Sequence, residues 1–144
     1  MHIATKGSKV DISSKKKLEE FAINLSSELK KGDIFFLFGE MGVGKTTFVK
    51  YLINNLQLIL KQKVTEVTSP TFNIMNEYNI KGLSIKHYDL FRLKSSNELG
   101  DLNLFEKNDQ AILLIEWPEM IKKEPSLVTK LFFRYENEYQ KRFI

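Results

Sequence analysis

One glycine-rich segment in the first third of the chain constrains the fold more than any other feature. Gly39–Thr46 reads GEMGVGKT and matches the pattern G-x-x-x-x-G-K-[ST] at every fixed position. Glycines let the backbone turn tightly, so that successive N–H groups can approach phosphate oxygens. The helix expected after this loop directs its unpaired N–H groups and its positive dipole end at the same anion. The segment therefore predicts a phosphate-binding P-loop between a strand and a helix.

Side-chain chemistry assigns a role to the last residues of this loop. Lys45 supplies a flexible positive charge for the β- and γ-phosphates of a nucleotide, and the Thr46 hydroxyl can coordinate Mg²⁺. Thr47 adds a second hydroxyl near the start of the helix. The predicted nucleotide-binding residues of the loop are Gly39, Glu40, Met41, Gly42, Val43, Gly44, Lys45, Thr46 and Thr47.

The hydrophobic pattern on both sides of the loop predicts alternating strands and helices. Ile34–Phe38 is a short apolar run typical of a buried strand, and Thr46–Leu56 carries apolar residues at helical spacing. An earlier apolar stripe predicts a helix from Leu18 to Leu29, capped by Ser13 or Ser14. Further predicted strands are Leu83–Tyr88, Ala111–Ile115, Leu127–Tyr135 and Tyr139–Ile144, and Ser95 with Glu98 predicts a capping box at the start of a short helix.

This order of elements predicts the fold class. Alternating strands and helices favour an α/β, P-loop NTPase-like three-layer sandwich with helices on both faces of a mixed, mostly parallel sheet. The late strands suggest that the antiparallel part of the sheet comes from the end of the chain. Because the chain has 144 residues and no linker-like segment, we expect residues 1–144 to form a single domain.

Amino-acid composition indicates where the protein is located and which classes of ligand it could bind. The chain has no cysteine, which excludes disulfides and thiolate metal sites and agrees with a cytoplasmic location. Its longest apolar runs are far too short to cross a bilayer, so we expect no membrane association. The formal charge of +4 suits anionic ligands such as nucleotides. Since the lysines are spread along the chain, we interpret them as a solvated surface rather than a nucleic-acid-binding patch.

Two carboxylates are candidate partners for the metal. Glu116 follows the predicted strand Ala111–Ile115, and Asp89 follows the predicted strand Leu83–Tyr88. The carboxyl ends of strands in open α/β sheets are where ligands bind. From position alone, each carboxylate could equally be a loop residue that only ends its strand.

Other polar and aromatic residues near these strands have a simpler interpretation. The Ser69–Phe72 segment contains Thr71, which could sense a γ-phosphate as switch segments do, but an ordinary proline turn explains it as well. His87 could touch the site, although strand histidines are more often merely packed. Arg92 could stabilise developing phosphate charge, but a surface or ion-paired arginine is the simpler interpretation. Trp117 is the single tryptophan, and packing is its simplest role, although its place beside Glu116 would let its fluorescence report on nucleotide binding.

Four segments taken together resemble one family, the TsaE ATPases of bacterial tRNA threonylcarbamoyladenosine synthesis. The segments are GEMGVGKTTF (Gly39–Phe48), VTSPTFNIMNEY (Val67–Tyr78), HYDLFRL (His87–Leu93) and LLIEWPE (Leu114–Glu119). Their order and spacing also agree with the family, and the resemblance extends from Leu18 to Arg134.

The resemblance implies a Mg²⁺-dependent ATPase of low intrinsic activity. It assigns phosphate binding to Lys45, the metal to Thr46 and Glu116, a place near the hydrolytic water to Asp89, and a switch-like segment to Thr71. It also implies docking onto a TsaD–TsaB transferase that modifies adenosine 37 of tRNA, with tRNA contacted only indirectly or weakly.

The chain departs from the family pattern at one position, and the resemblance also suggests adenine contacts near both ends of the chain. Phe91 stands where the family more often has tyrosine, a departure without obvious chemical cost. Ser14 and the Lys141–Arg142 region are candidate adenine contacts by the same resemblance.

The P-loop alone leaves other functions open. A small P-loop kinase would need a second substrate pocket, usually with an arginine-rich lid, whereas this chain has only Arg92, Arg134 and Arg142, which are far apart. A non-hydrolysing docking module would use ATP only to order a surface. A GTPase would need an [NT]-K-x-D motif, and the nearest stretch, Glu106–Asp109, has the wrong first residue.

Overall fold

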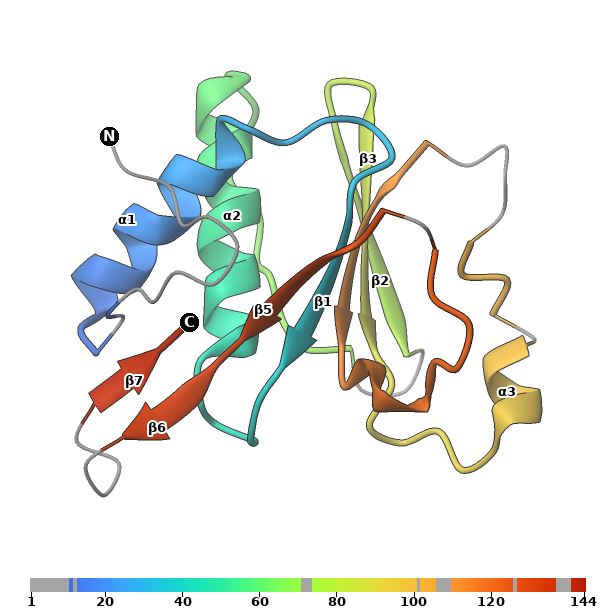
Figure 1. Ribbon diagram of the computed structural model, residues 1–144. Helices are drawn as coiled ribbons and strands as arrows, with labels where there is room; N and C mark the ends of the chain where they lie inside the picture. Colours follow the sequence, from blue (N-terminus) through green and yellow to red (C-terminus); the bar gives the residue numbers. More distant parts are fainter. Residues whose placement is uncertain are drawn as a thin grey trace.

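A five-stranded sheet forms the centre of the molecule (Figure 1). The computed structural model describes residues 11, 13–70, 74–100, 102–105, 110–125, 127–136 and 141–144. The strands lie in the order β2-β3-β4-β1-β5. Their bounds are β1 Ile34–Phe38, β2 Met75–Ile80, β3 Leu83–Asp89, β4 Ile112–Glu116 and β5 Thr129–Phe132. The four strands β3, β4, β1 and β5 run parallel, and β2 pairs antiparallel with β3.

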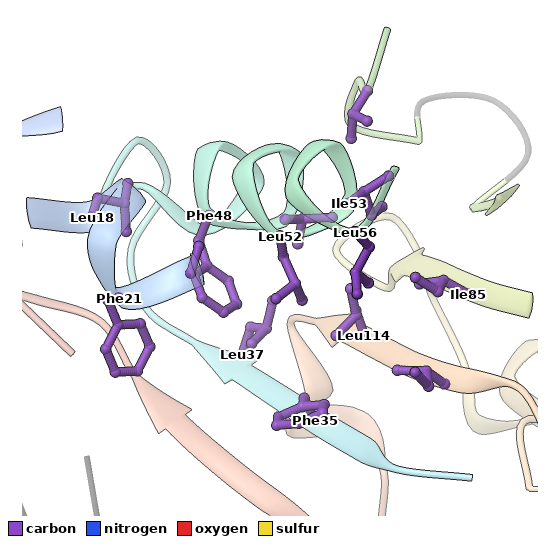
Figure 2. Packing of buried hydrophobic residues seen from close by; sticks show 14 of the residues in the cluster. Leu18, Phe21, Phe35, Leu37, Phe48, Leu52, Ile53, Leu56, Ile85 and Leu114 are labelled. Atoms are coloured by element: carbon purple, nitrogen blue, oxygen red, sulfur yellow. The ribbon is translucent and has the colours of Figure 1, made fainter. Parts of the chain in front are cut away.

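Two long helices cover one face of this sheet (Figure 1). They are α1 (Lys15–Ser26) and α2 (Lys45–Ile59). Figure 2 shows that their apolar side chains meet those of the sheet, with Leu52 of α2 between the helix and Leu37 of β1. The same cluster also contains Leu18, Phe21, Phe48, Ile53, Leu56, Phe35, Ile85 and Leu114. Burial of this apolar surface is what fixes α2, and hence the loop before it, against β1.

The opposite face of the sheet has shorter covering elements. They are α3 (Ser96–Gly100), the 3₁₀-helix η1 (Pro118–Met120) and the connecting segments around them (Figure 1). A second buried cluster lies here and includes Phe36 of β1, Tyr88 of β3 and Ile115 of β4. The central strands β1 and β4 are therefore buried on both faces, as their uninterrupted apolar sequences predict. These layers confirm the α/β, mostly parallel fold class.

The parallel pairing brings the ends of three strands together where α2 begins (Figure 1). In the register of β3 and β4, Asp89 lies opposite Glu116, and in that of β1 and β4, Leu37 lies opposite Glu116. Gly39 follows β1 directly. The carboxylates and the glycine-rich loop, which are far apart in sequence, thus share one edge of the sheet.

The source of the antiparallel strand differs from our expectation. The antiparallel member of the main sheet is β2, which the hydrophobic pattern did not predict because its sequence MNEYNI is largely polar. The late strands β6 (Arg134–Glu136) and β7 (Lys141–Phe143) are antiparallel but form a separate two-stranded sheet.

The predicted strand Leu127–Tyr135 is divided at Phe133. The Phe133 N–H donates to the carbonyl of Phe38 over 2.8 Å, at the last residue of β1. Beyond that point the β1 chain turns into the glycine-rich loop and offers no further partner. The polypeptide therefore leaves the main sheet and pairs with β7 instead.

The ends of the two long helices differ by about a turn from the sequence pattern, since α1 stops at Ser26, before Leu29, the last residue of its apolar stripe. Ser14 is the N-cap of α1, and its hydroxyl accepts a hydrogen bond from the Lys17 N–H over 3.1 Å. The P-loop helix continues to Ile59, a turn beyond the predicted end at Leu56. No helix in the described part of the chain is long and apolar enough to cross a membrane.

Candidate functional site

The loop between β1 and α2 has the backbone geometry that its glycines permit. Gly39, Gly42 and Gly44 have φ values of 149°, 81° and 119°, a region that other residues rarely adopt. Space is also limited at Gly39, where a Cβ atom would lie 2.7 Å from the Phe133 carbonyl oxygen. Because α2 begins at Lys45, inside the P-loop motif, the N–H groups at the helix N-terminus lie next to those of the loop backbone.

Lys45 is buried, with only 4% of its surface exposed. Its ammonium group donates to the Gly39 carbonyl over 2.5 Å and lies 3.8 Å from the centre of the Trp117 ring. Burial lowers the pKa of Lys45 below its usual value, and the nearby carboxylates of Glu116, Asp89 and Glu119 partly oppose that shift. The loop thus holds a desolvated cation whose main partners are a carbonyl and an aromatic face.

Glu116 ends β4 and is 3% exposed. The Thr46 hydroxyl lies 3.1 Å from its Oε2 and 3.3 Å from its Oε1. Oε2 is also 2.5 Å from Nε2 of His87, which is fully buried on β3. Glu116 therefore connects the start of α2 with two adjacent strands.

Asp89 ends β3, and both of its carboxylate oxygens have partners. The Ser69 hydroxyl donates to Oδ2 over 3.1 Å, and the Phe91 N–H donates to Oδ1 over 3.0 Å. Ser69 belongs to the segment between α2 and β2. This bond ties that segment to the site.

A cavity of about 410 Å³ opens among these groups. Its lining comprises Met41, Gly42, Gly44, Lys45, Thr46, Thr47, Ser69, Pro70, Asp89, Phe91, Arg92, Glu116 and Trp117. Helix N–H groups, an ammonium group and an arginine give it the chemistry to bind a polyanion.

The donor atoms around this cavity also fit Mg²⁺. The hydroxyl of Thr46 and the carboxylates of Glu116 and Asp89 are hard oxygen ligands, which Mg²⁺ prefers, and it completes its shell with waters and phosphate oxygens. No group of three or more His, Cys, Asp or Glu side chains suited to a metal lies in the described part of the chain.

Comparison with known proteins identifies the family. The family model described as threonylcarbamoyl adenosine biosynthesis protein TsaE matches residues 12–144. The chain belongs to the TsaE family.

Individual TsaE relatives agree with this assignment. The tRNA threonylcarbamoyladenosine biosynthesis protein TsaE of Rickettsia prowazekii is 38% identical over 111 residues, which are 77% of this chain and 74% of that protein. The protein of the same name from Bacillus subtilis is 38% identical over 96 residues, or 66% of this chain and 56% of that one.

A solved structure has the same fold as this TsaE-family chain. The crystal structure of Bacillus subtilis YdiB matches 94% of this chain and 81% of its own with a TM-score of 0.68. Because the identity is 24%, this likeness supports the fold alone.

The structure brings together most of the residues that the TsaE resemblance singled out. Lys45, Thr46, Asp89 and Glu116 all line the cavity, as do Met41, Gly42, Gly44 and Thr47. Their roles in binding and catalysis stay predictions.

Three of the predicted loop residues do not line the described cavity. Gly39 accepts the Lys45 hydrogen bond, Val43 is buried in the core, and Glu40 is exposed. Any phosphate contact of Val43 would have to use its backbone. Thr71 lies outside the described residues.

Three residues of this TsaE-family site make contacts that the sequence pattern did not predict. Trp117 and His87 were interpreted as packed side chains, and Ser69 received no separate role, yet each contacts a predicted site residue. A signal for His87 was present, because residues two apart on a strand share a face and Asp89 follows it by two. No sequence signal places Trp117 over Lys45, since that contact depends on the turn at Trp117, whose φ is 56°.

Proposed function

We propose that this TsaE-family chain binds MgATP and hydrolyses it slowly, in support of tRNA threonylcarbamoyladenosine synthesis by a TsaD–TsaB-type transferase. The observation that carries the proposal is the convergence of Lys45, Thr46, Asp89 and Glu116 on one cavity at the helix N-terminus. Loop N–H groups and an ammonium group suit a triphosphate, and the paired hydroxyl and carboxylate suit its metal.

Binding requires the ammonium group of Lys45 to leave one of its partners. In the free protein it donates to the Gly39 carbonyl, and we expect it to turn toward the β- and γ-phosphates when ATP enters. Thr46 and Glu116 would hold Mg²⁺, which supplies charge neutralisation at the transferring phosphoryl group. Electrostatic interactions between these groups and the phosphates would be stronger where water is excluded, because the effective dielectric constant is lower there.

Asp89 is the proposed acceptor or orienter for the attacking water. Its oxygens are engaged by Ser69 and Phe91 in the free protein. Each oxygen accepts one of these bonds and a carboxylate oxygen can accept a second, so Asp89 can keep both partners while it orients a water molecule.

We expect the isolated protein to be slow. Among the described residues that line the cavity, Arg92 is the one arginine, and it lies three residues after the end of β3. An arginine finger is worth about 10³–10⁵ in rate. We therefore expect a higher rate in the complex, which a steady-state assay with and without TsaD and TsaB checks; fast turnover by the isolated protein would contradict it.

Two other functions are separated from this one by direct measurements. A kinase would produce a phosphorylated acceptor when small molecules are screened. A non-hydrolysing docking module would keep full activity in the complex when Asp89 or Glu116 is replaced by alanine, as long as ATP still bound. Competition between ATP and GTP tests the base preference.

The decisive experiment is reconstituted tRNA modification with the wild type and Lys45→Ala. We expect the substitution to weaken ATP binding at least about tenfold, since hydrogen bonds to charged groups are worth roughly 1.5–3 kcal/mol. Multiple turnover of the transferase should then be lost. Full modification activity with Lys45→Ala would refute the proposal.

A further inference from the structure

A buried pair on adjacent strands lies behind the proposed metal site. Nε2 of His87 on β3 is 2.5 Å from Oε2 of Glu116 on β4, and their side chains are 0% and 4% exposed. Because a carboxylate only accepts hydrogen bonds, the imidazole proton is assigned to Nε2. Removing such a polar pair from water costs free energy, which a well-formed hydrogen bond between the two side chains must offset.

Among the described residues, Glu116 is the one hydrogen-bond partner of the His87 ring. Its Nδ1 is buried and makes no hydrogen bond with any of them. Within the described part of the chain, the contact with Glu116 is therefore the hydrogen bond that orients the imidazole ring. A histidine retained for folding alone would be expected to satisfy both ring nitrogens.

The contact leaves the two oxygens of Glu116 unequal. Oε2 faces His87 at 2.5 Å and Thr46 at 3.1 Å, whereas the nearest printed partner of Oε1 is Thr46 at 3.3 Å. The shorter, stronger bonds therefore hold Oε2, and Oε1 is the oxygen with spare acceptor capacity. It lies beside the Thr46 hydroxyl, the other proposed ligand.

We propose that His87 is a positioning residue for magnesium: it fixes the rotamer of Glu116 so that one carboxylate oxygen stays beside Thr46. This inference rests on the proposed MgATP function and adds a determinant of metal affinity, His87, that is not itself a proposed ligand. Outer partners of metal ligands commonly change metal affinity about 10- to 100-fold.

The test compares ATP affinity with and without magnesium in His87 variants. His87→Gln can place an amide N–H near the position of Nε2, whereas His87→Asn is shorter and His87→Leu has no donor. Calorimetry in EDTA and in magnesium buffer gives the gain in affinity that the metal provides. We expect wild type and His87→Gln to share this gain, and His87→Leu and His87→Asn to lose about tenfold of it, with unchanged affinity in EDTA.

A matched control separates positioning from stability. Gln57 is a buried polar residue of α2 that bonds to Thr65, away from the cavity. Gln57→Leu should lower the melting temperature without changing the magnesium gain. Asn and Leu at position 87 give two donor-deficient variants, so that one can be measured if the other does not fold.

Each outcome has a distinct meaning. An equal magnesium gain in wild type and either donor-deficient variant would overturn the positioning role alone. A reduced gain in Gln57→Leu would also overturn it, because general destabilisation would then explain the effect. Absence of any magnesium gain in the wild type would instead refute the metal part of the proposed function.

Discussion

At the residue scale, Lys45 shows how the free site keeps a cation ready for phosphate. Burial destabilises the charged form of the ammonium group. That form is stabilised by the Gly39 carbonyl, the Trp117 ring and nearby carboxylates. Among the described residues, no carboxylate makes a close ion pair with the ammonium group, so we expect a phosphate to be a stronger partner than the contacts that it would replace.

This balance predicts a pH dependence that can be isolated by substitution. Burial lowers the folded-state pKa of Lys45 below 10.5, so between that lowered pKa and 10.5 the unfolded chain binds more protons than the folded one. The free energy of unfolding of the wild type should therefore rise with pH relative to that of Lys45→Met across this window. Denaturant titrations of both proteins at several alkaline pH values measure the difference; a flat or falling difference would contradict the burial effect.

Trp117 should report directly on the movement of Lys45. Because the ring is the chain's only tryptophan and lies 3.8 Å from the ammonium group, displacement of that group by phosphate changes the ring's electrostatic environment. We expect tryptophan fluorescence to change saturably with MgATP. In Lys45→Met the same titration should give no saturable change at those concentrations, which serves as the control.

At the element scale, the site depends on one close approach between the P-loop and the β5–β6 connection. Gly39 contacts the backbone of Phe133, whose N–H is bonded to the last residue of β1. The ring of Phe133 in turn packs against Phe48 of α2, at 5.6 Å between ring centres. A segment near the end of the chain therefore supports the loop, which lies in its first third.

Gly39→Ala should disturb this support. The added Cβ would lie 2.7 Å from the Phe133 carbonyl oxygen and would also require a φ near 149°. We expect a loss of roughly 1–3 kcal/mol of stability and weaker ATP binding, since the loop must shift. Gly82→Ala is the control, because it also has a positive φ but nothing within 4 Å of the new Cβ; equal effects on ATP affinity would refute the argument.

Helix α1 contains a local conflict that can be relieved. Its first turn has Lys15, Lys16 and Lys17 and no acidic residue, although a helix N-terminus favours negative charge. Lys16→Glu should therefore stabilise the protein by about 0.3–1 kcal/mol at low ionic strength. Thermal denaturation at low and high salt checks this, and a gain that does not shrink with salt would argue against a dipole effect.

At the scale of the whole molecule, the core and the site are joined through α2. One side of this helix packs Leu52 and its neighbours against the sheet, while its N-terminus borders the proposed phosphate site. Ligand binding and core packing should thus make additive contributions to the free energy of unfolding. A change in core packing should leave the affinity for the ligand unchanged.

A core variant tests this separation. Leu52→Ala should cost about 2–5 kcal/mol through lost burial and the cavity left behind. MgATP at about 100 times its dissociation constant should restore about 2.7 kcal/mol, in the variant as in the wild type. Thermal melts with and without MgATP measure both terms; a much smaller rescue of the variant would show that the core change reaches the site.

The sequence alone predicted the elements that have strong patterns. The apolar run Ile34–Phe38, the P-loop and the helix after it follow from local composition and spacing, and so does the strand that leads to Glu116. Those features also predicted the fold class, because glycines and apolar periodicity act over a few residues of chain. The family resemblance depended on the P-loop together with the segments Val67–Tyr78, His87–Leu93 and Leu114–Glu119.

Only the tertiary structure decided which strands are neighbours and which side chains meet. The polar strand β2, the separate β6–β7 sheet, the Trp117 ring over Lys45 and the His87–Glu116 pair all join residues distant in sequence. The physical reason is that their positions are set by competition for burial and hydrogen-bond partners across the whole chain, which no local pattern records.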